Sequence, residues 1–163
     1  MEPEWEERGR RVLEACRRAG VKLALAEAST GGLIAACLTD IPGASAVVER
    51  GFIPYSNEAK TELLDVPVAL MVAHGAVSEE VARALAEGAL AHSHADVALA
   101  ETGIAGPTGG SAAKPVGLVH LVVSRRGGAT TCERHVFSGD RASIRRAAAA
   151  RGLELLLSHL EGG

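Results

Sequence analysis

Three short stretches carry residues whose types and spacing are suited to chemistry. The first, AEASTGG at residues 26–32, ends an aliphatic run with the hydroxyls of Ser29 and Thr30 and with the glycines Gly31 and Gly32. Backbone N–H groups at a helix start are unpaired, and glycines let a ligand approach them closely. The stretch therefore predicts a cradle for an oxyanion or a phosphate, although an ordinary helix cap made by Ser29 or Thr30 explains it equally well.

The second stretch is the loop TGIAGPTGG at residues 102–110, which follows the apolar run DVALAE. It has four glycines and one proline in nine residues, more than a turn requires. Two strands that each lead into a glycine-rich loop at their carboxyl ends predict a ligand site there. A purely structural loop is the alternative interpretation.

The third stretch, YSNEAK at residues 55–60, contributes Tyr55 and Lys60. The chain uses 14 arginines and only three lysines, which favours a task for lysine that arginine cannot perform. A desolvated lysine can lose its proton and act as a base, whereas arginine stays charged. Lys60 is therefore a candidate base.

Two arginines lie one helical turn apart near the predicted start of the last helix. Arg141 and Arg145 follow the string FSGD, and both guanidinium groups can fork onto one phosphate or carboxylate. The alternative is a surface pair that bonds Asp140 or Glu154.

Composition and charge exclude several classes of protein. Apolar residues make up 47% of the 163 residues, and the net charge of −3 is spread along the chain, which argues against binding to nucleic acid or to a membrane surface. No apolar stretch reaches the roughly 20 residues of a membrane span. The polar start MEPEWEERGRR is not a secretory signal. We therefore expect a cytoplasmic protein.

The cysteines and histidines show no metal-binding pattern. The chain has no CxxC or HExxH motif. His92 and His94 are two residues apart, which on a helix directs them to different faces. We expect no metal site, and the widely spaced cysteines Cys16, Cys37 and Cys132 suit reduced thiols.

The elements that must position these stretches alternate between strands and helices and end in a hairpin. This order predicts a single domain over residues 1–163, a three-layer α/β/α fold with a mixed, mostly parallel sheet. The predicted strands cover residues 22–27, 47–56, 96–101, 116–124 and 132–137. The predicted helices cover residues 5–19 (within an amino-terminal helical segment 1–20), 33–39, 57–64, a segment that begins after Ser78, and 140–160.

Six motifs in a fixed order resemble those of the CinA carboxy-terminal domain, the nicotinamide-nucleotide amidase (PncC) family. They are AE-x-x-TGG, YSNEAK, AHGAVSEE, TGIAGP-x-GG, KPVG and F-x-GDR. The likeness runs from about Leu25 to the last helix. The chain has no room for the additional amino-terminal domain of the two-domain members, so it resembles the stand-alone form.

The resemblance implies that the chain hydrolyses the carboxamide of nicotinamide mononucleotide to nicotinic acid mononucleotide and ammonia. It implies no metal or organic cofactor, and a homodimer or larger homo-oligomer. The family mechanism is thought to use a serine nucleophile, a lysine base and a tyrosine, and Tyr55 and Lys60 match the last two. The substrate-binding positions implied by the motifs, together with the glycine-rich first loop, are Thr30, Gly31, Gly32, Thr102, Gly103, Ala105, Gly106, Arg141 and Arg145.

The chain departs from the family pattern where the site should lie. The usual string is Glu-Ser-x-Thr-Gly-Gly, and Ala28 stands at the position of its serine. Pro54 precedes the tyrosine where a small or polar residue is usual, and Glu101 precedes TGIAGP where an apolar residue is usual. The motifs of the scaffold are intact.

Three accounts of these departures stay open. In the first, Ser29 acts as the nucleophile one position downstream, which requires the turn to re-aim its side chain because adjacent residues point opposite ways. In the second, hydrolysis is lost and the domain binds a pyridine nucleotide or a similar phosphate ligand. In the third, Glu101 or water replaces covalent chemistry.

Overall fold

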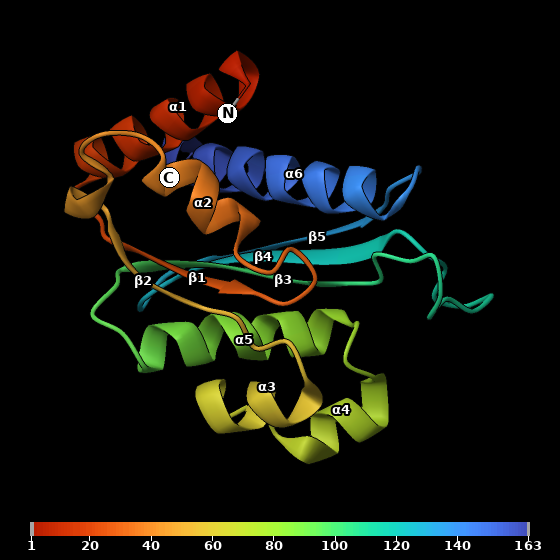
Figure 1. Cartoon of the computed structure of the whole chain (residues 1–163). Helices are drawn as coiled ribbons and strands as arrows, with labels where there is room; N and C mark the ends of the chain where they lie inside the picture. The colour runs from red at the N-terminus through yellow and green to blue at the C-terminus, as the bar shows by residue number, and fades with distance from the viewer. Residues whose placement is uncertain (1, 163) are drawn as a thin grey trace.

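The computed structural model describes residues 2–162, which form a central sheet between two layers of helices (Figure 1). One face of the sheet carries α1 (Pro3–Ala19), α2 (Leu33–Thr39) and α6 (Arg141–Gly162). The other face carries α3 (Asn57–Leu64), α4 (Val68–His74) and α5 (Glu79–Ala91). The strands are β1 (Leu23–Glu27), β2 (Val48–Phe52), β3 (Val97–Gly103), β4 (Leu118–Arg125) and β5 (Thr130–Val136), and a short 3-10 helix, η1, covers Ala44–Ala46.

The sheet is mixed, with the strand order β2-β1-β3-β4-β5. β1 pairs in parallel with β2 and β3, whereas the β3–β4 and β4–β5 pairs are antiparallel. The prediction of a mixed sheet is confirmed, but the prediction that it is mostly parallel is wrong. Half of the strand pairs are antiparallel, because no helix separates β3, β4 and β5 and each strand therefore returns directly beside the one before it.

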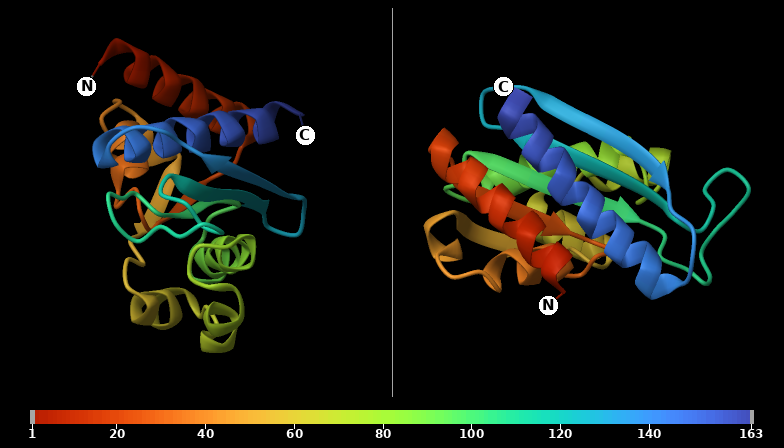
Figure 2. Two further views of the ribbon diagram at one scale, coloured as in Figure 1. Left: turned by 90° about the vertical axis from the view of Figure 1, so that its right-hand side faces the viewer. Right: turned by 90° about the horizontal axis from the view of Figure 1, so that it is seen from above.

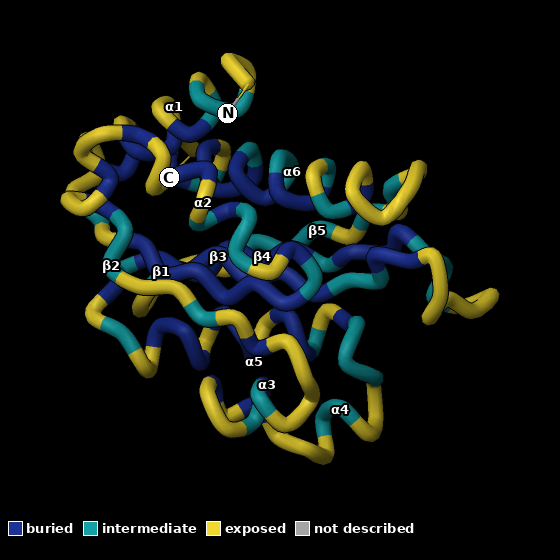
Figure 3. The backbone as a smooth tube through the Cα atoms, in the orientation of Figure 1, coloured by how far each residue is buried: buried dark blue, intermediate teal, exposed yellow. Residues whose placement is uncertain are grey.

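Successive side chains of β1 point to opposite faces of the sheet and pack into two different hydrophobic cores. Leu23 and Leu25 face the core that packs under α1, α2 and α6, while Ala24 and Ala26 face the core under α5. In Figure 3 the strands β1, β3 and β4 are mostly buried, whereas α4 has exposed and half-buried residues. A strand covered on both sides needs no polar face, which explains why β1 is wholly apolar up to Glu27.

Local signals set several of the helix ends. α1 ends at Gly20, whose φ of 68° is the left-handed conformation that glycine adopts readily. The hydroxyl of Ser78 accepts a hydrogen bond from the Val81 N–H and caps α5, as predicted. α6 is continuous through Gly152 and packs beside α1 over the sheet (Figure 2).

Two elements differ from the prediction. The strand predicted at residues 47–56 stops at Phe52, before Pro54, which has no N–H for a sheet ladder. The sequence did not predict α4, whose seven residues include no buried side chain. Leu70 and Met71 of this helix pack against the core under α5, but polar residues do not alternate with them at the helical period, so the segment gives no periodicity to detect. Within residues 2–162, none of the helices combines the length and apolar character that a membrane span requires.

Candidate functional site

A pocket of about 310 Å³ lies at the carboxyl ends of β1 and β3 and joins the three stretches singled out in the sequence. Lys60 and Thr102, from two different motifs 42 residues apart in the sequence, line the same cavity. Ala28 also lines it, next to Ser29. The predicted site residues found in its wall are Ser29, Tyr55, Lys60, Thr102, Gly103, Ala105, Gly106 and Arg141.

Four predicted substrate-binding residues, Thr30, Gly31, Gly32 and Arg145, do not line this pocket. Thr30 is fully buried. The Nε of Arg145 donates to the Ser29 carbonyl at 3.0 Å, and its Nη2 donates to the Thr30 carbonyl at 2.8 Å. Arg145 thus ties the loop after β1 to α6, and the structure does not place it in a fork with Arg141.

The start of α2 is capped by a carboxylate from the preceding strand. The N–H groups of Ile34 and Ala35 donate to the Glu27 carboxylate at 2.8 and 3.0 Å. Gly32 is the N-cap residue and makes no side-chain cap. The predicted cap by Ser29 or Thr30 is therefore wrong, and Glu27 occupies N–H groups that the prediction of an anion cradle had left open for a ligand.

Glu101 lies beside Glu27, because the register of the parallel pair β1–β3 aligns the two residues. Its carboxylate is fully buried. The Ser29 hydroxyl donates to Oε2 at 2.6 Å, and the Thr30 N–H donates to Oε1 at 2.7 Å. Burial raises the pKa of Glu101 above its usual value, and the hydrogen bonds from Ser29 and Thr30 oppose this rise.

The turn after β1 brings Ser29 into the pocket wall while its hydroxyl contacts Glu101. Gly103 leaves the space that the hydroxyl needs, because a Cβ at Gly103 would lie 3.0 Å from Ser29 Oγ. Ala28 is buried and also borders the pocket. Adjacent residues therefore both reach the cavity wall, as the re-aimed turn of the first account requires.

Lys60 is buried on α3, with only 3% of its surface exposed. Its Nζ donates to the Tyr55 carbonyl at 3.1 Å. Burial lowers the pKa of Lys60 from its usual value, and the nearby Glu101 carboxylate opposes this effect. The position of Lys60 depends on α3, which Ser56 caps by accepting a hydrogen bond from the Ala59 N–H.

Arg141 joins the two sides of the pocket. Its Nη1 donates to the Gly106 carbonyl at 2.8 Å, and its Nη2 donates to the Tyr55 hydroxyl at 3.1 Å. Tyr55 is 61% exposed. This edge therefore offers a guanidinium and a phenol to an incoming ligand from a partly solvated position.

Several wall residues were not predicted. Thr102 donates from Oγ1 to the Ala76 carbonyl at 2.9 Å, which brings the AHGAVSEE motif to the site. The presence of this motif in the ordered set was the one signal that pointed to it. The unpredicted wall residues are Asn57, Ala76, Val77, Ile104, Thr108 and Gly109.

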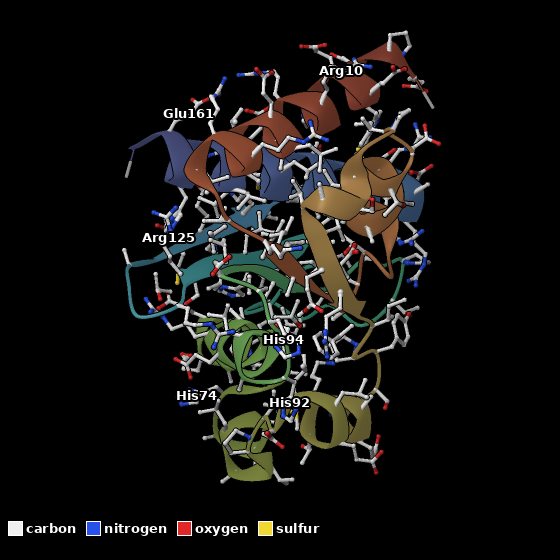
Figure 4. All side chains as sticks on the ribbon, turned by 90° about the vertical axis from the view of Figure 1, so that its left-hand side faces the viewer. Arg10, His74, His92, His94, Arg125 and Glu161 are labelled. Carbon is white, nitrogen blue, oxygen red and sulfur yellow. The ribbon has the colours of Figure 1, made fainter. Side chains whose placement is uncertain are left out.

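The histidines are not part of this pocket. His74, His92 and His94 lie around α5 and the helices outside it (Figure 4). His120 is half-buried on β4, where burial lowers its pKa. Among residues 2–162, no group of three or more His, Cys, Asp or Glu side chains is arranged to hold a metal ion.

Comparison with known proteins assigns the fold and its site to a family. The CinA C-terminal domain matches residues 6–160, which is nearly the whole chain. The chain belongs to the CinA C-terminal domain family. Residues of five of the six ordered motifs line the pocket, whereas those of KPVG at residues 114–117 do not.

The relatives agree in sequence and in structure. A CinA-like protein from Anaeromyxobacter sp. is 53% identical over 84% of this chain, and a putative competence-damage inducible protein from Symbiobacterium thermophilum is 48% identical over 88%. These alignments cover 33% and 35% of the relatives, so the chain spans about a third of the length of the curated proteins that it matches.

Solved structures are similar over their full length. The competence/damage inducible protein CihA from Agrobacterium tumefaciens superposes with a TM-score of 0.94 at 44% identity, covering 99% of this chain and 98% of that one. A CinA superfamily protein from Klebsiella pneumoniae gives 0.93 at 32% identity, covering 98% of this chain and 99% of that one.

Proposed function

We propose that this domain hydrolyses the carboxamide of nicotinamide mononucleotide, or of a close relative, to the carboxylic acid and ammonia. Ser29 serves as the nucleophile in place of the family serine, whose position is occupied by Ala28 in this chain. The observation that carries the proposal is that Ser29, Lys60 and Thr102 line one pocket. Family membership supports the reaction class.

The chemistry proceeds through an ester of Ser29. Its Oγ attacks the carboxamide carbon, ammonia leaves, and water hydrolyses the resulting acyl-enzyme. The buried Lys60 supplies positive charge where negative charge develops on the carbonyl oxygen. Arg141 and Tyr55, joined at the pocket edge, supply donors suited to the phosphate of the mononucleotide.

The test is ammonia release from nicotinamide mononucleotide by the purified chain. Ser29→Ala and Lys60→Ala should each lower kcat by at least about 100-fold. Arg146→Met is a matched control, because Arg146 is exposed and bonds Glu2 rather than the pocket. Wild-type turnover that survives Ser29→Ala would overturn the assignment of the nucleophile.

A domain that binds the nucleotide without hydrolysing it is the second candidate. One observation favours it: the Lys60 ammonium donates to the Tyr55 carbonyl, whereas the Ser29 hydroxyl donates to Glu101. The serine–lysine contact implied by the family mechanism is thus not among the hydrogen bonds of these two side chains. Calorimetric binding of the nucleotide without ammonia release would support this candidate.

The variant Ala28→Ser separates the two functions. If Ser29 is the nucleophile, restoring the family serine should change kcat less than about tenfold, because a working hydroxyl is already present. A silent domain with an intact pocket should instead gain activity with Ala28→Ser. Light scattering on the same samples checks the proposed homodimer or larger homo-oligomer.

A further inference from the structure

The carboxylates of Glu27 and Glu101 are linked to Ser29 by a chain of oxygen atoms inside the protein. Ser29 Oγ lies 2.6 Å from Glu101 Oε2. Thr30 Oγ1 lies 2.9 Å from Glu101 Oε1 and 2.8 Å from Glu27 Oε1. This chain is built from residues of two strand ends that are far apart in sequence, and the family mechanism assigns no role to Glu101.

The number of protons shared by these hydrogen-bonded oxygen atoms determines how many of their contacts can be hydrogen bonds. Three short oxygen–oxygen contacts have only two hydroxyl protons between them, one from Ser29 and one from Thr30. Since Thr30 Oγ1 carries one proton, it can donate to only one of its two carboxyl neighbours at a time. A proton on one carboxyl group would complete all three contacts, so the cluster is able to take up and return a proton.

Lys60 is less well placed to accept the serine proton. Its Nζ donates to the Tyr55 carbonyl at 3.1 Å, and it is an acceptor only after losing a proton. Glu101 has an oxygen already at hydrogen-bond distance from Ser29. Its other oxygen is held by the Thr30 N–H, which fixes the carboxyl plane.

We propose that Glu101, rather than Lys60, is the base that accepts the proton of Ser29 in this chain. This inference rests on the proposed function for the identity of the substrate, whereas the proton transfer from Ser29 to Glu101 is argued from the contacts of these residues alone. As the Oγ–carbon bond forms, the Ser29 proton moves to Glu101 Oε2 and the carbonyl π electrons move to oxygen. When the C–N bond breaks, the proton passes from Glu101 to the leaving nitrogen, which departs as ammonia.

The second half of the reaction returns the site to its starting state. A water molecule gives a proton to Glu101 and its hydroxide adds to the acyl carbon. The ester bond to Ser29 then breaks, and Glu101 returns the proton to Oγ. The net change is one carboxamide and one water converted to one carboxylic acid and one ammonia.

Charged groups from three other elements lie near Glu101, including Arg145 on α6, which donates to the carbonyls of Ser29 and Thr30. Glu27 on β1 destabilises the ionised Glu101, and Lys60 on α3 stabilises it. A base acts only when it is unprotonated, so the reactivity of Ser29 should fall as the pH drops through the raised pKa of Glu101. A lysine base would instead give reactivity that follows the pKa of Lys60, which burial lowers, and this dependence would disappear when Lys60 is replaced.

The test measures Ser29 reactivity without the substrate. A fluorophosphonate probe is incubated with the full chain from about pH 4 to pH 10, and labelling at Ser29 is followed by peptide mass spectrometry. Glu101→Gln should slow labelling by about 100-fold or more and abolish its dependence on the protonation of Glu101. Lys60→Met removes a stabilising charge, so labelling should slow, but its fall toward acid pH should remain and move to higher pH. Glu133→Gln is the matched control, because Glu133 lies on β5 and binds Arg151.

Each outcome decides the inference. Wild-type labelling with an acid limb and a plateau, lost in Glu101→Gln, supports it. Labelling that is lost in Lys60→Met but kept in Glu101→Gln overturns it, as does absence of Ser29 labelling in the wild type. If Glu101→Gln does not fold, as judged by circular dichroism, the pH profile of Lys60→Met decides. A fall in labelling toward acid pH that remains in this variant cannot belong to Lys60 and supports Glu101, whereas its disappearance overturns the inference.

Ammonia release separates this inference from the proposed function. If Ser29 is labelled in a Glu101-dependent way but nicotinamide mononucleotide yields no ammonia, the inference holds and the proposed function fails. If Glu101→Gln releases ammonia at the wild-type rate, the proposed function holds and Glu101 is not the base.

Discussion

The ends of β1 and β3 look alike in sequence but differ in what their backbones do. β1 ends at Glu27, and β3 carries Glu101 two residues before its end at Gly103; each strand is followed by a loop that contains glycines. After β1 a helix begins, and Glu27 binds its first N–H groups. After β3 no helix follows, and the backbone at Gly103 and Gly106 borders the pocket instead. The backbone after a strand can bind a ligand only where its N–H groups are not already hydrogen-bonded within the protein.

The largest expected effect tests the end of β1. Glu27→Ala leaves the N–H groups of Ile34 and Ala35 without their acceptor inside the protein, which should lower the free energy of unfolding by about 2–4 kcal/mol. Urea denaturation measures the change. Glu62→Ala, at an exposed position on α3, is the control and should change stability by less than about 0.5 kcal/mol. Equal stability of the two variants would mean that Glu27 does not cap α2.

A smaller effect tests the end of β3. In Gly103→Ala the new Cβ would lie 2.7 Å from Val119 Cγ2 and 3.0 Å from both the Leu118 carbonyl and Ser29 Oγ. We expect a loss of about 1–3 kcal/mol in the free energy of unfolding from this overpacking, and lower labelling of the displaced Ser29.

The control for this variant is Gly51→Ala on β2, where the nearest atom to an added Cβ is 3.8 Å away. This substitution meets only ordinary contacts and should leave stability within about 0.5 kcal/mol of wild type. Thermal melts of the two variants compare a crowded strand end with an open strand. A neutral Gly103→Ala would show that the pocket wall yields easily.

The smallest expected effect concerns the carboxylate that links the two strand ends. The pKa of Glu101 in the folded protein is raised above the usual 4.5 by burial. The folded state therefore holds this proton more tightly than the unfolded state does. The contribution of Glu101 to the free energy of unfolding is fully present below about pH 4.5 and is lost as the pH rises through the folded pKa.

Glu101→Gln removes this titration. The free energy of unfolding of the variant, compared with wild type between about pH 4 and pH 8, should rise relative to wild type as the pH increases. Denaturant midpoints at fixed pH values give the comparison. A difference between the two proteins that does not change with pH would contradict a raised pKa at Glu101.

Much of the fold follows from local signals in the sequence. Gly20 ends α1 and Ser78 begins α5 through contacts made within a few residues, so short strings suffice to predict them. The wholly apolar run at residues 23–26 predicts a strand covered on both sides, because such a strand has no polar face. The proportion of parallel pairs was not predictable in this way, because it depends on where each strand returns in the sheet.

The site also contains residues that the sequence identified and contacts that only the structure shows. The motif residues Tyr55, Lys60 and Thr102 were identified from the sequence, and the structure brings them to one pocket. The contact of Ser29 with Glu101 joins residues 72 positions apart. No local pattern records such a pair, although Glu101 stood out as a departure from the family motif.

The order of residues along the chain determined which groups are available: two apolar runs that end in glutamate, a rare lysine after a tyrosine, and a serine one place beyond the usual position. Only the tertiary structure decided which glutamate caps a helix and which meets the serine. The physical reason is that a carboxylate binds the donors nearest to it in space, and the β1–β3 register and the start of α2 set those distances.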